Sequence, residues 1–153
     1  MFSRQPNKEQ QTKDILERGS ILHMALQDTD GFFIQPVSYG FSTKKGQIVL
    51  YFCREKKGRK YEAYKQNPKV SVLIDHLSGY RIDSQQYLPC FESLRGTGTI
   101  EEVEGAHKKH ALFALLQHCG FEEQHIAFDE ILLDPELGFY KIDLEEVVTK
   151  KSV

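Results

Sequence analysis

Two short apolar runs constrain the fold of this chain more than any other feature of its sequence. Ile48–Phe52 and Val70–Ile74 are rich in β-branched and aromatic residues, and both are too short to be core helices. This pattern predicts two buried central strands. The segment between them begins with a basic turn and continues as a short helix that ends at Asn67-Pro68. The middle of the chain is therefore predicted to run strand, turn, helix, strand.

The basic turn is a candidate anion site. Lys56, Lys57, Arg59 and Lys60 surround Gly58 at the point where the helix begins. The first N–H groups of a helix have no partner within it, so a helix N-terminus with adjacent cations favours a bound anion. A phosphate is the natural ligand for such a site. The alternative is a solvated charged loop, because the segment contains no glycine-rich nucleotide fingerprint.

Turn signals elsewhere predict further strands in hairpin succession. Asp30-Gly31 and Lys44-Lys45-Gly46 are typical hairpin turns, and the second leads into the strand that starts at Gln47. Further strands are expected over Ile21–Leu26, Phe32–Thr43 and Cys90–Ile100, with a last one over Gly138–Leu144 and Val147–Thr149 that is interrupted near Glu145-Glu146. The segment His76–Pro89 has no sustained apolar period and is predicted to be a loop, with short strands as the alternative at its two ends. Residues 121–136 give no clear pattern.

Two longer helices are predicted beside these strands. Glu9–Arg18 ends at Gly19, and Gly105–Cys119 ends at Gly120, in keeping with the preference for glycine just after a helix. Residues 1–8 are expected to be a loose tail. About six strands in hairpin succession, with few helices, predict a mainly β fold: a small antiparallel β-barrel with flanking helices.

Composition limits the classes of function. The chain has 153 residues, which suits a single domain over residues 1–153, and its formal net charge of −2 provides no global positive field for nucleic acid. The longest apolar run, Ala111–Leu116, is far shorter than the ~20 residues of a membrane span. Three cysteines without metal-ligand spacing, and a polar start without a signal region, favour the cytoplasm. Neither a nucleic acid nor a membrane is an expected partner.

Three segments of the chain resemble a known family. They are IQPVSYGF (Ile34–Phe41), GRKYEAYKQNPKV (Gly58–Val70) and ESLRGTGTIEEV (Glu92–Val103). In their order and spacing they are similar to the FMN-binding split-barrel proteins related to pyridoxamine 5′-phosphate oxidase, in particular to the branch of the nitroimidazole-resistance proteins. The resemblance covers most of the chain, from Ile15 to Thr149. It implies a six-stranded antiparallel FMN-binding split barrel.

The resemblance also implies an assembly, a cofactor and a set of site residues. Proteins of this kind are homodimers that bind two FMN molecules in grooves at the subunit interface. The residues beside the isoalloxazine, mostly through backbone groups, would be Gln35, Pro36, Val37, Ser38 and Tyr39. Those around the ribityl phosphate would be Cys53, Arg54, Arg59 and Lys60, since guanidinium and ammonium groups bind phosphate strongly. Ser93 and Arg95 would approach the flavin from the facing strand of the partner subunit.

Cys53 is the position at which the chain departs from this family. Related nitroimidazole-resistance proteins commonly have histidine here, and a thiol cannot act like an imidazole near neutral pH. If Cys53 lies beside the phosphate, the neighbouring cations Arg54, Arg59 and Lys60 are expected to favour its thiolate. The alternative is a small apolar residue packed at the end of a strand.

Histidines on the second long helix form another candidate group. Its members are His107, His110, His118 and Cys119, with His125 beyond them. His107 and His110 are one helical turn apart and share a face, but they alternate with lysines in the manner of a polar helix face. No metal is therefore expected.

One principal hypothesis of function follows. It is an FMN-dependent oxidoreductase, similar to flavin reductases or nitroreductases, that transfers hydride or electrons from NAD(P)H to a small organic acceptor. A flavin carries the difficult chemical step itself, and no residue is assigned as a catalytic acid or base. The alternative, from a different class, is a non-catalytic FMN-binding protein that stores or senses the cofactor. Pyridoxamine-phosphate oxidation ranks third, because the short chain has no clear counterpart of that enzyme's extended C-terminal substrate-binding segment.

Overall fold

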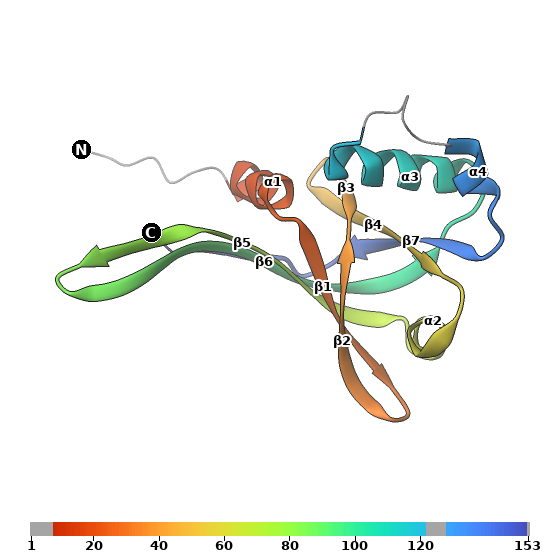
Figure 1. Cartoon of the computed structure of the whole chain (residues 1–153), viewed down its shortest axis with the longest axis horizontal. Helices are drawn as coiled ribbons and strands as arrows, with labels where there is room; N and C mark the ends of the chain where they lie inside the picture. The colour runs from red at the N-terminus through yellow and green to blue at the C-terminus, as the bar shows by residue number, and fades with distance from the viewer. Residues whose placement is uncertain (1–7, 122–127, 153) are drawn as a thin grey trace.

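The structure, a computed structural model, describes residues 8–121 and 128–152. Within them the chain forms, in order, α1 (Lys8–Arg18), β1 (Ile21–Asp28), β2 (Gly31–Ser38), β3 (Gly40–Lys44), β4 (Gln47–Glu55), α2 (Gly58–Gln66), β5 (Lys69–Asp83), β6 (Gln86–Glu102), α3 (Ala106–Cys119), α4 (Phe128–Leu133), β7 (Leu137–Leu144) and β8 (Val148–Lys151) (Figure 1). The strands make one sheet in the order β2-β1-β5-β6-β7-β4-β3, and β8 pairs with β6. Every paired register is antiparallel. The predicted mainly β fold with flanking helices is confirmed.

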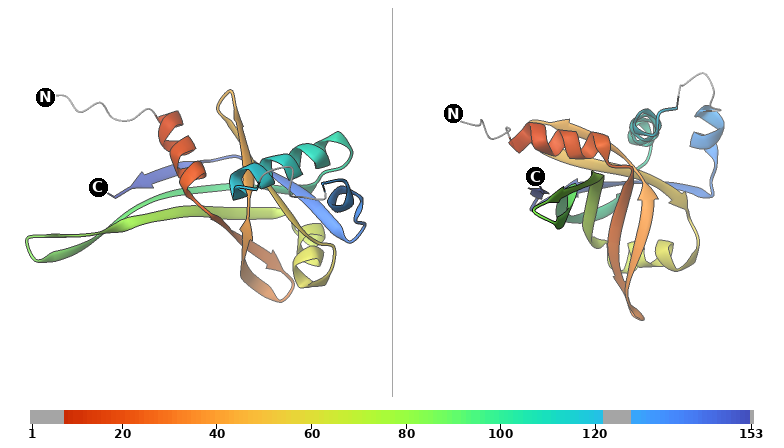
Figure 2. Two further views of the ribbon diagram at one scale, coloured as in Figure 1. Left: turned by 45° about the horizontal axis from the view of Figure 1, so that its top comes forward. Right: turned by 60° about the vertical axis from the view of Figure 1, so that its left-hand side comes forward.

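The sheet is rolled because its two edges are joined through one residue. β2 and β3 lie at opposite ends of the strand order, yet only Tyr39 separates Ser38 from Gly40. The two edges must therefore approach each other, and the sheet curls around an interior (Figure 2). The prediction of a single strand over Phe32–Thr43 is wrong at Tyr39. This division and the separate strand β8 give eight strands in the described residues, where six were predicted.

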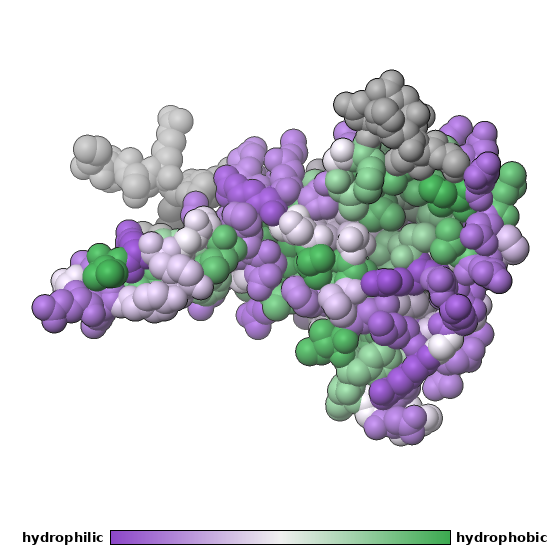
Figure 3. All heavy atoms as spheres, in the orientation of Figure 1, coloured by the Kyte–Doolittle hydropathy of each residue, from purple (hydrophilic) through white to green (hydrophobic). Residues whose placement is uncertain are grey.

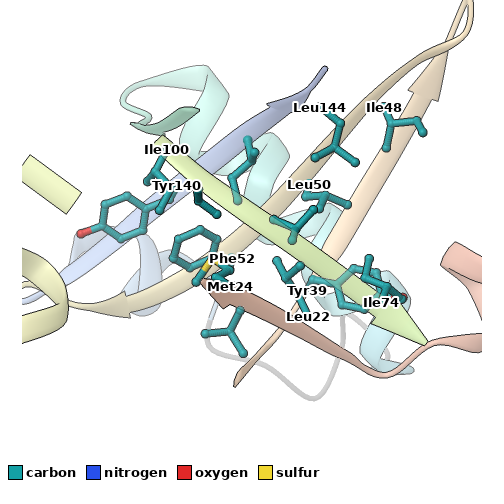
Figure 4. Close-up of a cluster of buried hydrophobic side chains, with 14 of the residues drawn as sticks. Leu22, Met24, Tyr39, Ile48, Leu50, Phe52, Ile74, Ile100, Tyr140 and Leu144 are labelled. Atoms are coloured by element: carbon teal, nitrogen blue, oxygen red, sulfur yellow. The ribbon is translucent and has the colours of Figure 1, made fainter. Parts of the chain in front are cut away.

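Apolar side chains fill the interior of the barrel (Figure 4). The two runs predicted to be central strands contribute alternate residues, including Leu50 and Phe52 from β4 and Val72 and Ile74 from β5. Phe52 stacks on Tyr140 of β7 with 5.0 Å between the ring centroids. Both strands are paired on both sides in the sheet, so the central position predicted for them is confirmed.

Tyr39 fixes the crossing between the two edges of the sheet. Its side chain is fully buried, and its hydroxyl lies 2.6 Å from the carbonyl oxygen of Leu16 and 3.0 Å from that of Gly19 at the end of α1. His118 of α3 contacts the same Gly19 oxygen at 2.8 Å and packs on the Tyr39 ring at 4.4 Å. Ile15, beside Leu16 in α1, is fully buried in the same core. One tyrosine thus ties α1, α3 and the strand crossing together.

A long two-stranded arm replaces the loop predicted for His76–Pro89. β5 continues to Asp83, β6 begins at Gln86, and the two strands pair along the arm with one register shift between Leu77 and Gly79. Ser84 and Gln85 form the turn with φ of 49° and 66°, the left-handed backbone that a tight hairpin turn requires. The arm extends away from the barrel (Figures 1 and 2). The loop prediction is therefore wrong.

The predicted helices are confirmed as α1, α2 and α3. Gly120 ends α3 with φ of 80°, and its N–H bonds back to the carbonyl oxygens of Leu116 and Gln117. α4 lies in the segment 121–136, whose residues show no clear pattern. The predicted tail falls largely on residues 1–7 and, like His125, lies outside the described residues. No described helix is both long and apolar enough to span a membrane.

Candidate functional site: a cationic pocket at the start of α2

A pocket of about 300 Å³ lies where β4 ends and α2 begins. The chain turns there directly from strand to helix, and the N–H of Lys56 fixes the turn by bonding to the carbonyl oxygen of Glu136 at 2.8 Å. The pocket is lined by Gln35, Cys53, Arg54, Glu55, Lys57, Lys60, Tyr64 and Leu137. Four of the predicted site residues are therefore brought together: Gln35, Cys53, Arg54 and Lys60.

Positive charge dominates this pocket. Arg54, Lys57 and Lys60 line it together with one carboxylate, Glu55, which pairs with Lys57 at 3.1 Å. Arg54 donates from Nη2 to the carbonyl oxygen of Pro36 at 3.1 Å. Within residues 8–121 and 128–152, Lys60 forms no ion pair. No side chain caps the first N–H groups of α2, which add their partial positive charge. The arrangement favours an anionic ligand.

A buried amide forms the opposite side of the pocket. Gln35 on β2 has no exposed surface, and its Oε1 accepts a hydrogen bond from the Tyr64 hydroxyl of α2. Its Nε2 has no hydrogen-bond partner in the described part of the chain. Burying an unsatisfied donor costs about 1–3 kcal/mol. Burial also raises the pKa of Tyr64 to about 12, although the Gln35 bond and Arg54 act in the opposite direction. Tyr64 therefore keeps its proton at neutral pH.

Cys53 lines the pocket, but its thiolate is not favoured. Burial raises the pKa of Cys53 to about 11, and the positive charges of Arg54 and Lys108 only partly oppose this shift. Arg54 acts in the expected direction, but burial outweighs it, so the expected net preference for the thiolate is wrong. The sulfur packs against the apolar cluster between the sheet and α3, as the alternative reading predicted. At neutral pH Cys53 is a protonated, weakly polar wall of the pocket.

Arg59 does not line this pocket. Its guanidinium makes two bonds to the carboxylate of Asp28 at the end of β1, of 2.7 Å and 3.0 Å, and lies 4.2 Å from the centroid of the Phe33 ring. The hydrogen bond from Arg59 is the main reason that the pKa of Asp28 is lowered. The pair joins α2 to the β1–β2 hairpin. A role for Arg59 in binding phosphate stays a prediction.

The remaining predicted residues of β2 and the β2–β3 junction are of two kinds, buried and exposed. Val37 and Tyr39 are buried in the barrel interior. Pro36 and Ser38 are exposed on the outer face of the sheet, and the Pro36 carbonyl connects this segment to the pocket through Arg54. Backbone contacts between this segment and a flavin stay a prediction.

Ser93 and Arg95 lie on β6, away from the other candidates. In the sheet, β1 and β5 separate β6 from β2. Ser93 is half-buried, Arg95 is exposed, and neither lines the pocket. The resemblance placed them opposite the flavin of a partner subunit, and that assignment stays a prediction.

Lys57 was predicted as part of the candidate anion site in the basic turn, and it lines the pocket. Three other pocket residues were not predicted: Glu55, Tyr64 and Leu137. Tyr64 was detectable only as part of a predicted helix, because nothing local indicates that it contacts Gln35, 29 residues earlier in the chain. Glu55 and Leu137 carry no sequence signal for this site.

Two of the three histidines of α3 make structural contacts, and His107 is exposed. His118 bonds to the Gly19 carbonyl, and His110 packs edge-on against Tyr51 with 5.4 Å between ring centroids. Among the described residues, no group of three or more His, Cys, Asp or Glu side chains has the arrangement of a metal site.

The rolled antiparallel sheet, with a cationic pocket where a strand meets a helix, defines a split-barrel protein. The chain belongs to the pyridoxamine 5′-phosphate oxidase family, because the sequence profile of that family matches residues 8–151. This confirms the resemblance seen in the sequence. No curated protein matches the chain.

Solved structures share the fold. A candidate 5-nitroimidazole antibiotic resistance protein from Bacteroides thetaiotaomicron superposes with a TM-score of 0.76 at 18% identity, over 95% of this chain and 84% of that one. An FAD-binding protein from Mesorhizobium loti gives 0.65 at 22% identity and covers 100% of both chains. The flavocytochrome Anf3 from Azotobacter vinelandii gives 0.70 at 16% identity, over 99% and 72%. At these identities the likeness concerns the fold alone.

Proposed function

We propose that this protein is an FMN-dependent oxidoreductase that passes hydride or electrons from a reduced nicotinamide to a small organic acceptor. The observation that carries the proposal is the excess positive charge of the pocket at the N-terminus of α2, where three cations face one carboxylate. A phosphate monoester with up to two negative charges matches such a pocket. Two proteins with the same fold, an FAD-binding protein and a flavocytochrome, support the choice of a flavin as the ligand.

The residues present fit the phosphate end of FMN in two respects. Lys60 and Arg54 supply charge, and Lys60 has no competing ion pair in the described part of the chain. The buried Nε2 of Gln35 is a donor without an acceptor, which a ligand oxygen would satisfy. Arg54 and Lys60 would therefore hold the phosphate, with Lys57 and the first N–H groups of α2 adding to the attraction.

The bound flavin would supply the hydride or electron transfer. The protein would bind and orient it: Arg54 connects the end of β4 to the Pro36 carbonyl, so the phosphate pocket and the β2 backbone are held in fixed relation. Cys53 and Tyr64 keep their protons at neutral pH, because their pKa values are raised to about 11 and about 12. Neither acts as a base, and both would serve to close the pocket wall.

A homodimer would complete the site. The outer face of β2 and β1 carries three exposed apolar side chains, Phe32, Ile34 and Ile21, with 79%, 69% and 39% of their surface accessible. Apolar side chains are also exposed along the arm (Figure 3). The solvent face of an antiparallel sheet is normally polar, so an apolar one favours an interface. A second copy covering this face would bring Ser93 and Arg95 toward the flavin of its partner.

A non-catalytic FMN-binding protein is the second candidate function. The observation that favours it is that the cations of the pocket account for the binding of a phosphate but supply no chemical step. Both functions need FMN, but only the first needs turnover.

The decisive experiment is spectroscopic and kinetic. The purified protein is mixed with FMN, and gel filtration is used to separate bound from free flavin. Flavin absorbance that stays with a dimer, followed by oxidation of NADH or NADPH that depends on an added quinone, nitro compound or free flavin, is the expected result. Retention of FMN without turnover would identify the storage or sensing protein. Failure to retain FMN would contradict both.

A further inference from the structure

The Gln35 amide is satisfied at one end and unsatisfied at the other. It lines the cationic pocket and is fully buried, its Oε1 accepts the Tyr64 hydroxyl proton, and its Nε2 has no partner in the described part of the chain. Buried side-chain amides normally find partners for both ends. An unsatisfied donor at the wall of a pocket is the arrangement expected where a ligand supplies the missing acceptor.

Tyr64 determines which end of the Gln35 amide lacks a hydrogen-bond partner. The Tyr64 hydroxyl keeps its proton, and the only acceptor recorded for it in the described residues is Gln35 Oε1. If the amide turned over, the hydroxyl would lose that acceptor and would face an N–H group instead. The bond therefore holds the oxygen toward Tyr64 and leaves the nitrogen as the free donor.

The Tyr64 ring is itself held by packing, so it can act as a fixed reference. It makes edge contacts with Phe52 and Tyr140, at centroid distances of 5.8 Å and 5.1 Å, and is almost fully buried. Both partners belong to the barrel core. The orientation of Gln35 is thus transmitted from the core to the pocket through one hydroxyl group.

We propose that Gln35 Nε2 donates a hydrogen bond to an acceptor oxygen of the bound ligand, and that Tyr64 is the positioning residue that keeps this donor turned toward the ligand. The inference rests on the proposed function, because it takes FMN as the ligand. It adds a neutral donor that specifies an acceptor at one point of the pocket, whereas Arg54 and Lys60 supply charge without that selectivity. It also explains why the protein keeps a buried donor unsatisfied.

The test compares Gln35→Met, Tyr64→Phe and the double variant with the unaltered protein. Gln35→Met removes both polar ends at similar volume, and Tyr64→Phe removes only the orienting hydroxyl. Dissociation constants for FMN are measured by quenching of flavin fluorescence, and thermal unfolding is followed without ligand. Tyr61→Phe is the matched control, because Tyr61 lies on the same helix but does not line the pocket.

Gln35→Met is expected to raise the FMN dissociation constant at least about tenfold. Without ligand, the unfolding temperature of Gln35→Met is expected to change little, because the unsatisfied Nε2 is gone but the Tyr64 hydroxyl loses its acceptor. In the double variant both unsatisfied groups are gone, and the unfolding temperature is expected to stay the same or rise. Tyr64→Phe is expected to raise the dissociation constant by a smaller factor, and to have no further effect in the Gln35→Met background, since it acts through Gln35. Tyr61→Phe is expected to leave binding unchanged.

The outcomes separate this inference from the function it rests on. If the unaltered protein does not bind FMN, the proposed function is refuted. If the unaltered protein binds FMN and Gln35→Met binds it equally well, only the inference is refuted. Should Gln35→Met fail to fold, Tyr64→Phe decides: unchanged FMN affinity in that folded variant would overturn the positioning role.

Discussion

Lys60→Ala tests whether the pocket binds the phosphate of FMN. Lys60 is exposed on the first turn of α2, lines the pocket and has no ion pair in the part of the chain that the structure describes. Its removal should therefore leave the folded state nearly as stable as before, since alanine is also a good helix residue. Any loss of affinity for FMN can then be attributed to the lost contact between Lys60 and the ligand.

The expected size of the effect follows from the exposure of Lys60. A hydrogen bond to a charged group contributes about 1.5–3 kcal/mol, and an exposed lysine, partly screened by water, belongs at the lower limit. A loss of about 1.5 kcal/mol raises the dissociation constant of FMN roughly tenfold. Riboflavin lacks the phosphate, so its dissociation constant should change less than about twofold. The ratio of the two constants is the quantity to measure.

Fluorescence titration with FMN and riboflavin, at low and high salt, provides the assay. Lys65→Ala is the matched control, because Lys65 lies on the same helix, pairs with Glu62 at 3.3 Å and does not line the pocket. Arg59→Ala is the second comparison: its guanidinium is held by Asp28 and does not line the pocket, so it should destabilise the fold and should discriminate between the two flavins less than Lys60→Ala does. Equal losses for FMN and riboflavin in Lys60→Ala would refute the placement of the phosphate.

Three further predictions concern other parts of the molecule. Because burial raises the pKa of Cys53 to about 11, iodoacetamide should label it slowly at pH 8 and faster as the pH approaches 11, more slowly than exposed Cys119, and FMN should protect it; peptide mass spectrometry measures both rates. The pKa of Asp28 is lowered from 3.8, so its pair with Arg59 stabilises the protein above that pH and the contribution is lost as the pH falls through the lower, folded-state pKa. The difference in unfolding free energy between the unaltered protein and Arg59→Ala, from urea titrations, should accordingly shrink on acidification; a constant difference would contradict this. Gly40→Ala would place Cβ 2.4 Å from the α3 backbone and should lower the free energy of unfolding by about 1–3 kcal/mol. An unchanged free energy of unfolding would show that α3 can move to make room, and would contradict this prediction.

The central strands of the sheet could be predicted because their buried side chains require a local run of apolar residues. Alternate residues of Ile48–Phe52 and Val70–Ile74 pack into the interior, and a strand in such a place needs β-branched or aromatic residues whatever the topology. The strand order could not be obtained in the same way. It depends on pairings between distant segments, such as β4 with β7, that no single run of residues specifies.

The arm could not be predicted because its residues face no core of the chain. Tyr80-Arg81-Ile82-Asp83 alternates apolar and polar residues over only four positions, and Ser78-Gly79 precedes it, so the sustained alternation that indicates a half-buried strand is missing. Its turn is Ser84-Gln85, which adopts left-handed backbone without the Asn-Gly or Asp-Gly signal that usually indicates it. Both strands continue into the arm from their pairing within the barrel, with the register shifted by one residue between Leu77 and Gly79.

The division of the second predicted strand at Tyr39 has a similar origin. Locally, Phe32–Thr43 is compatible with one continuous strand. The break becomes necessary only because Tyr39 must reach the carbonyl oxygens at the end of α1, about twenty residues earlier in the chain. The crossing is therefore a tertiary property.

Arg59 shows most clearly how far the site itself could be predicted. Its place in the basic turn made it a natural phosphate ligand, and the same reasoning correctly brought Lys60 to the pocket. The sequence does not indicate that Asp28, at the end of β1, takes both donor groups of the guanidinium. We infer that this bond positions α2 against the β1–β2 hairpin, so that its uncapped N-terminus and Lys60 border the pocket. Arg59 would then serve anion binding by holding the helix in place, while Lys60 supplies the charge.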